Sequence, residues 1–364
     1  MKVTIIGAGS GGASAVAELT RAGHEVALWN RSPATLEPFQ KIGGVEYEGI
    51  LGEGFAKPAL ITTDLAAAIR GAEAVVCTLP TFSHVAVAGA LAAAGMDPSV
   101  PVVLNPGHTG GALEFTAAWR AARPGAGVPP VADFNSLTYI ARKYQPQRVT
   151  TTGRARFLRA GCLPGGDKAV EVAMMLFPGV QRARDVLEVG LANPNMILHP
   201  PGAILGACWV EARKGDFTFY VEGMTPGVAR VMKALDDERR AVARAFGHEL
   251  PSVIGEMKKI GSVEASVTNE DDFVAAIAGG EANKRIAAPD SLGHRYYLED
   301  FGHGLLPFMA FAGAAGVAVP TAAALFELGV SLTGTDYRAK GRTAATMGIA
   351  GLDRAGILSL VRGK

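Results

Sequence analysis

Apolar and polar positions in the first half of the chain alternate between short apolar runs and helical patterns. The apolar runs predict strands at residues 3–6, 24–29, 74–79, 102–104, 131–134 and 149–152. Helical spacing and alanine-rich composition predict helices between these runs, including residues 65–70 and 82–94. Strands that alternate with helices in this way are typical of a Rossmann-type α/β fold, a doubly wound and mostly parallel sheet.

The pattern changes near residue 185, beyond which Ala, Leu and Met recur at helical spacing and few strand runs remain. We therefore predict two domains, a sheet-containing domain over residues 1–185 and a mainly α-helical domain over residues 186–364. Within the second domain, residues 229–246 predict an amphipathic helix. We expect the charged cluster at residues 236–240 to lie on the solvent-exposed side of this helix.

A glycine cluster follows the first predicted strand and precedes a helical pattern, which is the sequence context of a dinucleotide-binding turn. Its Gly7, Gly9 and Gly12 match G-x-G-x-x-G. The first glycine allows a tight turn, the second leaves room for a pyrophosphate and the third lets the helix approach the strand. The predicted cofactor site consists of Gly7, Ala8, Gly9, Ser10, Gly11 and Gly12, with Leu79 and Pro80 at the end of another strand. The alternative is a glycine-rich turn that binds no ligand.

The end of the second predicted strand indicates which dinucleotide binds. NAD sites usually place a carboxylate there to bind the ribose 2′-hydroxyl. This chain has Asn30, Arg31 and Ser32 instead, and Arg31 is suited to bind a 2′-phosphate through charge-assisted hydrogen bonds. We therefore predict that these three residues contact the cofactor, that NADP is preferred and that NAD remains possible. In the alternative interpretation Arg31 is a solvated surface residue and both cofactors are accepted.

Composition narrows the class of protein. The net charge of +1 argues against a nucleic-acid partner, and three widely separated cysteines fit neither a disulfide framework nor a zinc site, so no metal is expected. The apolar stretch at residues 304–332 is interrupted by prolines and glycines, which favours core or homodimer-interface helices over a membrane span. Met1 leads directly into the first predicted strand without a signal peptide, so we expect a cytoplasmic protein.

Candidate acid–base chemistry lies in the second half of the chain. A hydride transfer from a nicotinamide needs a proton donor, and histidine is the usual one near neutral pH. His199 follows the predicted domain boundary closely, and Pro200 and Pro201 stiffen the backbone beside it. Further on, Arg295 is suited to bind a carboxylate and Asp300 to orient a histidine. The alternatives are a packing histidine and an exposed helix start with ordinary ion pairs.

Taken together, these segments resemble the octopine/nopaline (opine) dehydrogenase family nearly from end to end. The resemblance rests on residues 7–12, 104–114 and 133–139, on the segments around His199 and from Arg295 to Asp300, and on residues 341–343 and 348–352. Asp133 and Thr138 depart from the glutamate and proline that are usual in the family at these positions.

The resemblance implies a reductive condensation with two small-molecule substrates. An α-keto acid and the amine of an amino acid form an imine, which NAD(P)H reduces to a secondary amine dicarboxylate. Carried over, His199 is the acid–base residue, Asp300 its orienting partner and Arg295 the ligand of a substrate carboxylate, with Asn195 nearby. Two other functions remain open at this point: an NAD(P)-dependent hydroxy acid dehydrogenase and a non-catalytic nucleotide-binding protein.

Overall fold

The computed structural model describes residues 1–281, 283–284 and 286–363. It contains two units, of which the first comprises Met1–Gly107 and Gly111–Val186. The second comprises His108–Gly110 and Leu187–Lys364, although Lys364 itself lies outside the described residues. The short segment of residues 108–110 thus belongs with the C-terminal unit, which no pattern along the sequence had indicated.

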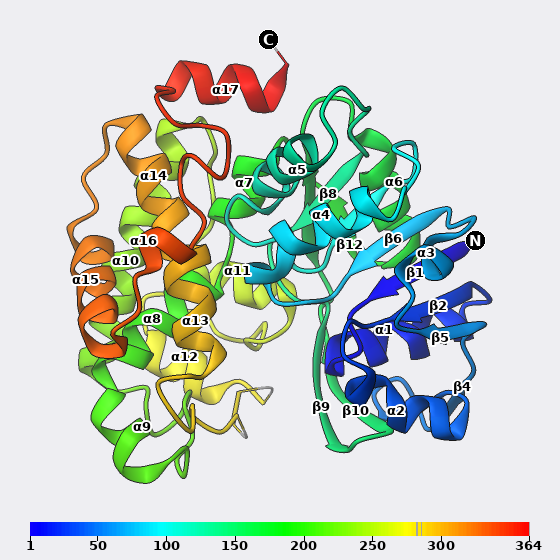
Figure 1. The fold of residues 1–364 in the computed structure, drawn as a ribbon. Helices are drawn as coiled ribbons and strands as arrows, with labels where there is room; N and C mark the ends of the chain where they lie inside the picture. Colours follow the sequence, from blue (N-terminus) through cyan, green and yellow to red (C-terminus); the bar gives the residue numbers. More distant parts are fainter. Residues whose placement is uncertain (282, 285, 364) are drawn as a thin grey trace. The chain divides into compact units, whose positions relative to one another are not determined.

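The first unit is built on an eight-stranded sheet in the order β12-β11-β8-β7-β6-β1-β2-β5 (Figure 1). The strands are β1 Lys2–Ile6, β2 Glu25–Trp29, β5 Leu60–Thr62, β6 Ala74–Cys77, β7 Val102–Leu104, β8 Val131–Phe134, β11 Leu158–Cys162 and β12 Val180–Arg182. Adjacent strands are parallel except for β11, which pairs with β8 in the antiparallel direction. The predicted Rossmann-type sheet is confirmed.

Helices follow the strands as the alternation predicts. They are α1 Ser10–Arg21, α2 Pro33–Ile42, α3 Leu65–Ile69, α4 His84–Ala93, α5 Gly111–Ala122 and α6 Asp167–Leu176. The central strands β6 and β7 are buried along their whole length, as expected for parallel strands covered on both faces. α3 begins where Asp64 accepts a hydrogen bond from the N–H of Ala67, which satisfies one of the free donors of the first turn.

A second sheet of four strands extends the first unit in the order β4-β3-β10-β9. Its strands are β3 Val45–Gly49, β4 Gly54–Ala56, β9 Tyr139–Gln145 and β10 Arg148–Arg154. β3 and β4 form an antiparallel hairpin. Helix α1 packs against strands of both sheets, and Glu18 on α1 accepts hydrogen bonds from Tyr139 and Arg154 at 2.6 and 2.8 Å. The first helix of the fold therefore has a sheet on each side.

The second unit is helical where the structure describes it, apart from loops and an isolated bridge. It contains α7 Val186–Leu191, α8 Asn195–Leu205, α9 Ala207–Arg213, α10 Pro226–Ala245, α11 Val253–Ile260, α12 Phe273–Gly279, α13 Arg295–Asp300, α14 Leu306–Ala315, α15 Pro320–Thr333, α16 Tyr337–Lys340 and α17 Arg354–Arg362. A π-helical turn at Phe301–Leu305 joins α13 to α14. The described helices include none that is long and apolar enough to cross a membrane.

Helix α8 lies at the centre of this unit and contacts α10, α13 and α15. Pro200 and Pro201 lie inside α8 and cannot donate backbone hydrogen bonds to the carbonyl groups four residues earlier. The helix nevertheless continues to Leu205. Packing against three helices, with Met196 and Ile197 fully buried, outweighs the loss of these two backbone bonds.

The expectation that the charged cluster at residues 236–240 faces solvent holds for Asp237, which is exposed, but is wrong for Asp236 and Arg239. Asp236 and Arg239 are 2% and 1% exposed and form an ion pair at 2.7 Å. Arg239 also donates to the carbonyl groups of Leu191 and Pro251. Helical spacing alone gave no sign that a paired Asp and Arg would be buried, because burial of such charges depends on partners that are distant in sequence.

Candidate functional site

His199 and Asp300 lie next to each other in the helical unit. Nδ1 of His199 is 2.7 Å from Oδ2 of Asp300, and the residues are 5% and 2% exposed. Because a carboxylate accepts hydrogen bonds, Nδ1 carries the proton and Nε2 keeps a lone pair. Oδ1 of Asp300 is buried and, among the described residues, has no hydrogen-bond partner. The structure thus brings together the two residues that the sequence analysis paired.

Aromatic residues enclose the His199 ring. Tyr296 stacks on it with ring centroids 3.6 Å apart and an angle of 17° between the planes. Phe219 meets the ring edge-on at 6.3 Å, and the hydroxyl group of Tyr220 lies 2.8 Å from Nε2. Burial, followed by the neighbouring Tyr296, raises the pKa of Tyr220 well above its ordinary value. The imidazole is therefore held in one orientation.

Arg295 and Asp300 occupy the two ends of α13. Nε and Nη2 of Arg295 donate to the same carboxylate oxygen of Glu299, at 3.0 and 2.6 Å. The Glu299 side chain is 1% exposed, whereas that of Arg295 is 39% exposed. A buried carboxylate thus orients the guanidinium group of a side chain that is itself only partly buried. This arrangement differs from the alternative of an exposed helix start with ordinary surface ion pairs.

His108 extends the cluster from the segment of residues 108–110. Its Nδ1 lies 3.9 Å from Oε1 of Glu299, and its Nε2 lies 3.4 Å from Nδ2 of Asn195. Burial lowers the pKa of His108 to about 4, although the nearby Glu299 and Asp300 favour its charged form. His108 is therefore neutral at neutral pH. Asn195, predicted near the site, contacts His108 on one side of this cluster.

The glycine cluster in the first unit has the geometry that its motif predicts. Gly7 has a φ of +110°, a conformation that favours glycine. A Cβ at Gly12 would lie 1.8 Å from the carbonyl oxygen of Gly7, so only glycine permits this close approach of α1 to β1. Nothing lies within 4 Å of a Cβ at Gly9, the position that must stay open for a pyrophosphate. The residues present therefore fit a dinucleotide.

The predicted cofactor residues at the strand ends surround this loop. Oδ1 of Asn30 accepts a hydrogen bond from the N–H of Ala8 at 3.2 Å, and its Nδ2 donates to the carbonyl of Ser32. Arg31 is exposed. The Leu79 side chain lies against Gly7, 2.8 Å from the position of a Cβ there. Asn30 thus holds the glycine loop in shape, and the Arg31 side chain faces solvent.

Two departures from the family pattern have a structural role in the first unit. Oδ2 of Asp133 accepts a hydrogen bond from the N–H of Ala112 at 2.9 Å. Thr138 donates from both its N–H and its hydroxyl to Oδ1 of Asn105, at 3.2 and 3.0 Å. A proline at position 138 has no N–H and no hydroxyl, so it could form neither bond.

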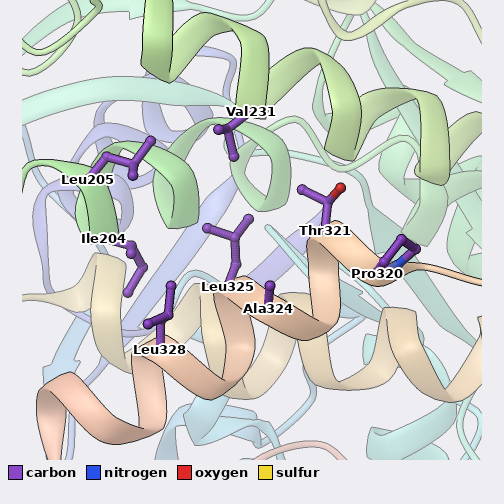
Figure 2. A pocket seen from close by; sticks show the side chains of 8 residues that line it. All are labelled: Ile204, Leu205, Val231, Pro320, Thr321, Ala324, Leu325 and Leu328. Atoms are coloured by element: carbon purple, nitrogen blue, oxygen red, sulfur yellow. The ribbon is translucent and has the colours of Figure 1, made fainter.

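An apolar cavity of about 410 Å³ lies elsewhere in the helical unit. Its lining residues are Ile204, Leu205, Val231, Pro320, Thr321, Ala324, Leu325 and Leu328. Figure 2 shows that these side chains converge from α8, α10 and the first turns of α15. None of them is ionisable, so their side chains offer neither an acid–base group nor a cation that could pair with a carboxylate. Across the described ranges, no group of three or more His, Cys, Asp or Glu could hold a metal ion.

Comparisons with known proteins identify the family. The octopine/nopaline dehydrogenase family (NAD/NADP-dependent, alpha-helical domain) matches residues 182–333. The N-terminal domain of NAD-dependent glycerol-3-phosphate dehydrogenase matches residues 2–108. An opine dehydrogenase from Arthrobacter sp. (strain 1C) is 32% identical over 359 residues, which cover 98% of each chain. The chain belongs to the opine dehydrogenase family.

Solved structures share the fold of this opine dehydrogenase family member. Octopine dehydrogenase with NADH and L-arginine superposes with a TM-score of 0.76 at 24% identity, covering 100% of this chain and 98% of that one. Yersinopine dehydrogenase with NADP⁺ has a TM-score of 0.73 at 18% identity, covering 95% and 97%. The predicted family, the class of NAD(P)-dependent oxidoreductase and NAD(P)H-dependent reductive condensation are confirmed.

Several residues of the site escaped the sequence analysis. Glu299 follows Arg295 by four residues, a spacing that places two side chains on one helix face, and this rule could have found it. Tyr220 and His108 have no comparable signal, because their contacts with His199 and Glu299 come from separate segments. In the first unit, Nζ of Lys143 donates to the carbonyl of Ala8 at 3.1 Å, and no pattern in β9 predicted this contact.

Proposed function

We propose that His199, Asp300 and Arg295 carry out the protein's part of the reductive condensation, in which an α-keto acid is joined to the amine of an amino acid. The observation that carries the proposal is the buried hydrogen bond between His199 and Asp300, with a carboxylate-binding arginine at the other end of the same helix α13. Reductive condensation needs proton transfer and recognition of carboxylates. The helical unit supplies residues for both of these tasks.

Asp300 fixes the tautomer of His199. With Nδ1 protonated and bonded to the carboxylate, Nε2 is the atom that takes and gives protons. Protonated at Nε2, His199 is the source of the proton with which the hydroxyl group of the carbinolamine leaves as water. When the imidazole becomes positively charged, the buried carboxylate of Asp300 stabilises it. The nicotinamide cofactor supplies the hydride that reduces the imine.

Arg295 binds the carboxylate of the keto acid. Its Nε and Nη2 are bonded to Glu299, and the N–H donors of the guanidinium group that these two bonds do not use are offered to the substrate. Glu299 thereby holds the guanidinium plane in position before substrate arrives. Such preorganisation reduces the entropy lost on binding.

NADPH is the preferred cofactor in this proposal. No carboxylate follows β2 to repel a 2′-phosphate, and the exposed Arg31 offers it a cation. Lys143 places a second cation beside the glycine loop. A relative in fold, yersinopine dehydrogenase, was solved with NADP⁺. Replacing Arg31 with Asp should lower the ratio of kcat/KM for NADPH over NADH about tenfold or more, whereas an unchanged ratio would remove Arg31 from cofactor selection.

A panel of substrate pairs tests the proposed function. Oxidation of NADPH and NADH is followed with each of several α-keto acids, alone and with each of several amino acids. We expect turnover only when both substrates are present. Turnover that needs no amine would instead indicate a hydroxy acid dehydrogenase. Cofactor binding without turnover of any pair would indicate a nucleotide-binding protein.

Two further properties expected from the sequence belong to this proposal. They are a cytoplasmic location and a homodimer. Gel filtration combined with light scattering would test the second directly.

A further inference from the structure

Both ring nitrogens of His199 form hydrogen bonds within the protein. Nδ1 is bonded to Asp300, and the hydroxyl group of Tyr220 lies 2.8 Å from Nε2. Because Nδ1 carries the proton, Nε2 is the acceptor and the Tyr220 hydroxyl is the donor. The nitrogen atom that gains and loses the catalytic proton is therefore in contact with a tyrosine.

The imidazole has little freedom to turn away from this tyrosine. Tyr296 stacks on the ring at a centroid distance of 3.6 Å, and Phe219 packs against its edge. Rotation of the ring would break the bonds to Asp300 and Tyr220 together with the stacking contact. A proton can reach or leave Nε2 through the Tyr220 hydroxyl without any movement of the ring.

We propose that Tyr220 is a further catalytic residue, whose hydroxyl group carries the proton between Nε2 of His199 and the substrate. The inference rests on the proposed function of His199 in reductive condensation. His199 is hydrogen-bonded to the Tyr220 hydroxyl. The nearby Tyr296, Asp300 and Arg295 influence its pKa.

The character of the Tyr220 hydroxyl fits this task. Burial, together with Tyr296 and Asp300, raises the pKa of Tyr220, so the phenol keeps its proton at neutral pH. A phenol that stays protonated can transfer a proton only by giving one away while it accepts another. This requires a hydrogen-bonded partner on the donor side, and Nε2 is in that position.

The relay balances in the dehydration of the carbinolamine. The Tyr220 hydroxyl gives its proton to the substrate hydroxyl oxygen, and Nε2–H of protonated His199 gives its proton to the Tyr220 oxygen. The C–O bond breaks with its electron pair on oxygen, and the nitrogen lone pair forms the C=N bond. Water leaves, a protonated imine remains, His199 has lost one proton and Tyr220 is unchanged.

The competing explanation is that Tyr220 only fills the place of a substrate and is displaced when the substrate binds. Tyr220→Phe separates the two explanations because it removes the hydroxyl group and keeps the ring. Tyr297→Phe is the matched control. Tyr297 is also buried in this unit, but its hydroxyl donates to the carbonyl of Ala203 and does not contact His199.

The test is the single-turnover oxidation of NADPH by the full-length enzyme with a substrate pair that the wild type accepts. The relay predicts that Tyr220→Phe lowers the rate about 100-fold, within the range for general acid–base catalysis, with KM for the keto acid changed less than threefold. Tyr297→Phe should keep the wild-type rate. A wild-type or faster rate in Tyr220→Phe would overturn the relay.

The proton inventory of the wild type gives a second measurement that does not depend on any variant. In mixtures of H₂O and D₂O, the relay predicts a curved dependence of the rate on deuterium content, because two protons move in one step. A linear dependence means one moving proton and overturns the relay. Either negative result would leave turnover of the substrate pair intact, so it would be distinct from failure of the proposed function, in which no pair is turned over.

Discussion

Nδ1 of His199 lies 2.7 Å from Oδ2 of Asp300, although 101 residues separate them along the chain. The two residues come from α8 and α13, which pack against each other in the helical unit. Removing the charge from Asp300 should therefore disable His199 without disturbing the other unit. Asp300→Asn keeps the size of the side chain, and its amide can donate to Nδ1 and favour the wrong tautomer.

We predict that Asp300→Asn lowers kcat about 1,000-fold or more, as the same change does where a carboxylate orients a catalytic histidine. The Kd for NADPH, measured by quenching of cofactor fluorescence, should stay within twofold of the wild-type value. Asp353→Asn is a suitable control, because Asp353 is exposed and caps α17. A kcat for Asp300→Asn near that of this control would show that the carboxylate has no part in proton transfer.

A second prediction concerns Arg295, which we assign to carboxylate binding. Arg295→Lys keeps the positive charge but loses the planar group that bonds to Glu299 through Nε and Nη2. KM for the keto acid should rise about tenfold or more, with a smaller effect on KM for NADPH. Arg213→Lys, an exchange at an exposed ion pair with Asp216, should change neither value. If KM for the keto acid stays the same in Arg295→Lys, another residue binds the carboxylate.

Two glycines of the cofactor turn should respond differently to the same substitution. In Gly12→Ala the added Cβ would lie 1.8 Å from the carbonyl oxygen of Gly7, so α1 must shift and the melting temperature should fall. In Gly9→Ala the Cβ meets nothing within 4 Å, so the melting temperature should not change. Cofactor titration should nevertheless show at least tenfold weaker binding, because that space receives the pyrophosphate. Normal cofactor binding by Gly9→Ala would contradict this account of the turn.

The pH dependence of stability should report on His108. Burial lowers its pKa to about 4 from 6.5, so between these values the unfolded state binds a proton that the folded state does not. Stability from neutral His108 is therefore complete above pH 6.5 and is lost as the pH falls toward 4. Between pH 7 and pH 5 the contribution lost is about 2 kcal/mol, at 1.36 kcal/mol for each pKa unit.

His108→Asn provides the comparison, because Asn tolerates the left-handed backbone of this residue, whose φ is 58°. The free energies of unfolding of both proteins are measured with urea at pH 7 and pH 5. Other titrating groups are common to both proteins and largely cancel. The wild type should lose about 2 kcal/mol more than the variant between pH 7 and pH 5. An equal loss in both proteins would mean that His108 titrates normally.

Local patterns predicted the sheet of the first unit because parallel buried strands are continuous apolar runs. Strands β7 and β8 begin and end at the predicted residues. The pairing of β3 with β10 was not predictable, since the two strands are about one hundred residues apart and pairing across such a distance leaves no periodic signal. The buried ion pair of Asp236 and Arg239 escaped prediction for a similar reason, because its partners come from distant segments.

In the candidate site, too, some residues could be predicted from the local sequence and others could not. The glycine turn could be predicted from the local sequence, since Gly7 adopts a positive φ and Gly12 closely approaches the carbonyl group of Gly7, five residues earlier. His199 and Asp300 were assigned through the family resemblance, and neither one's local pattern indicates the other. Tyr220 became visible only in the folded unit, where its hydroxyl meets Nε2.

Isotope labelling tests the central claim, reductive condensation, most directly. The enzyme is supplied with an α-keto acid, an ¹⁵N-labelled amino acid and NADPH deuterated at the transferred position, and the product is analysed by mass spectrometry. The account predicts one product, a secondary amine that carries both the ¹⁵N atom and one deuterium. A deuterated hydroxy acid without ¹⁵N would contradict it and would show that the enzyme reduces the keto acid without an amine.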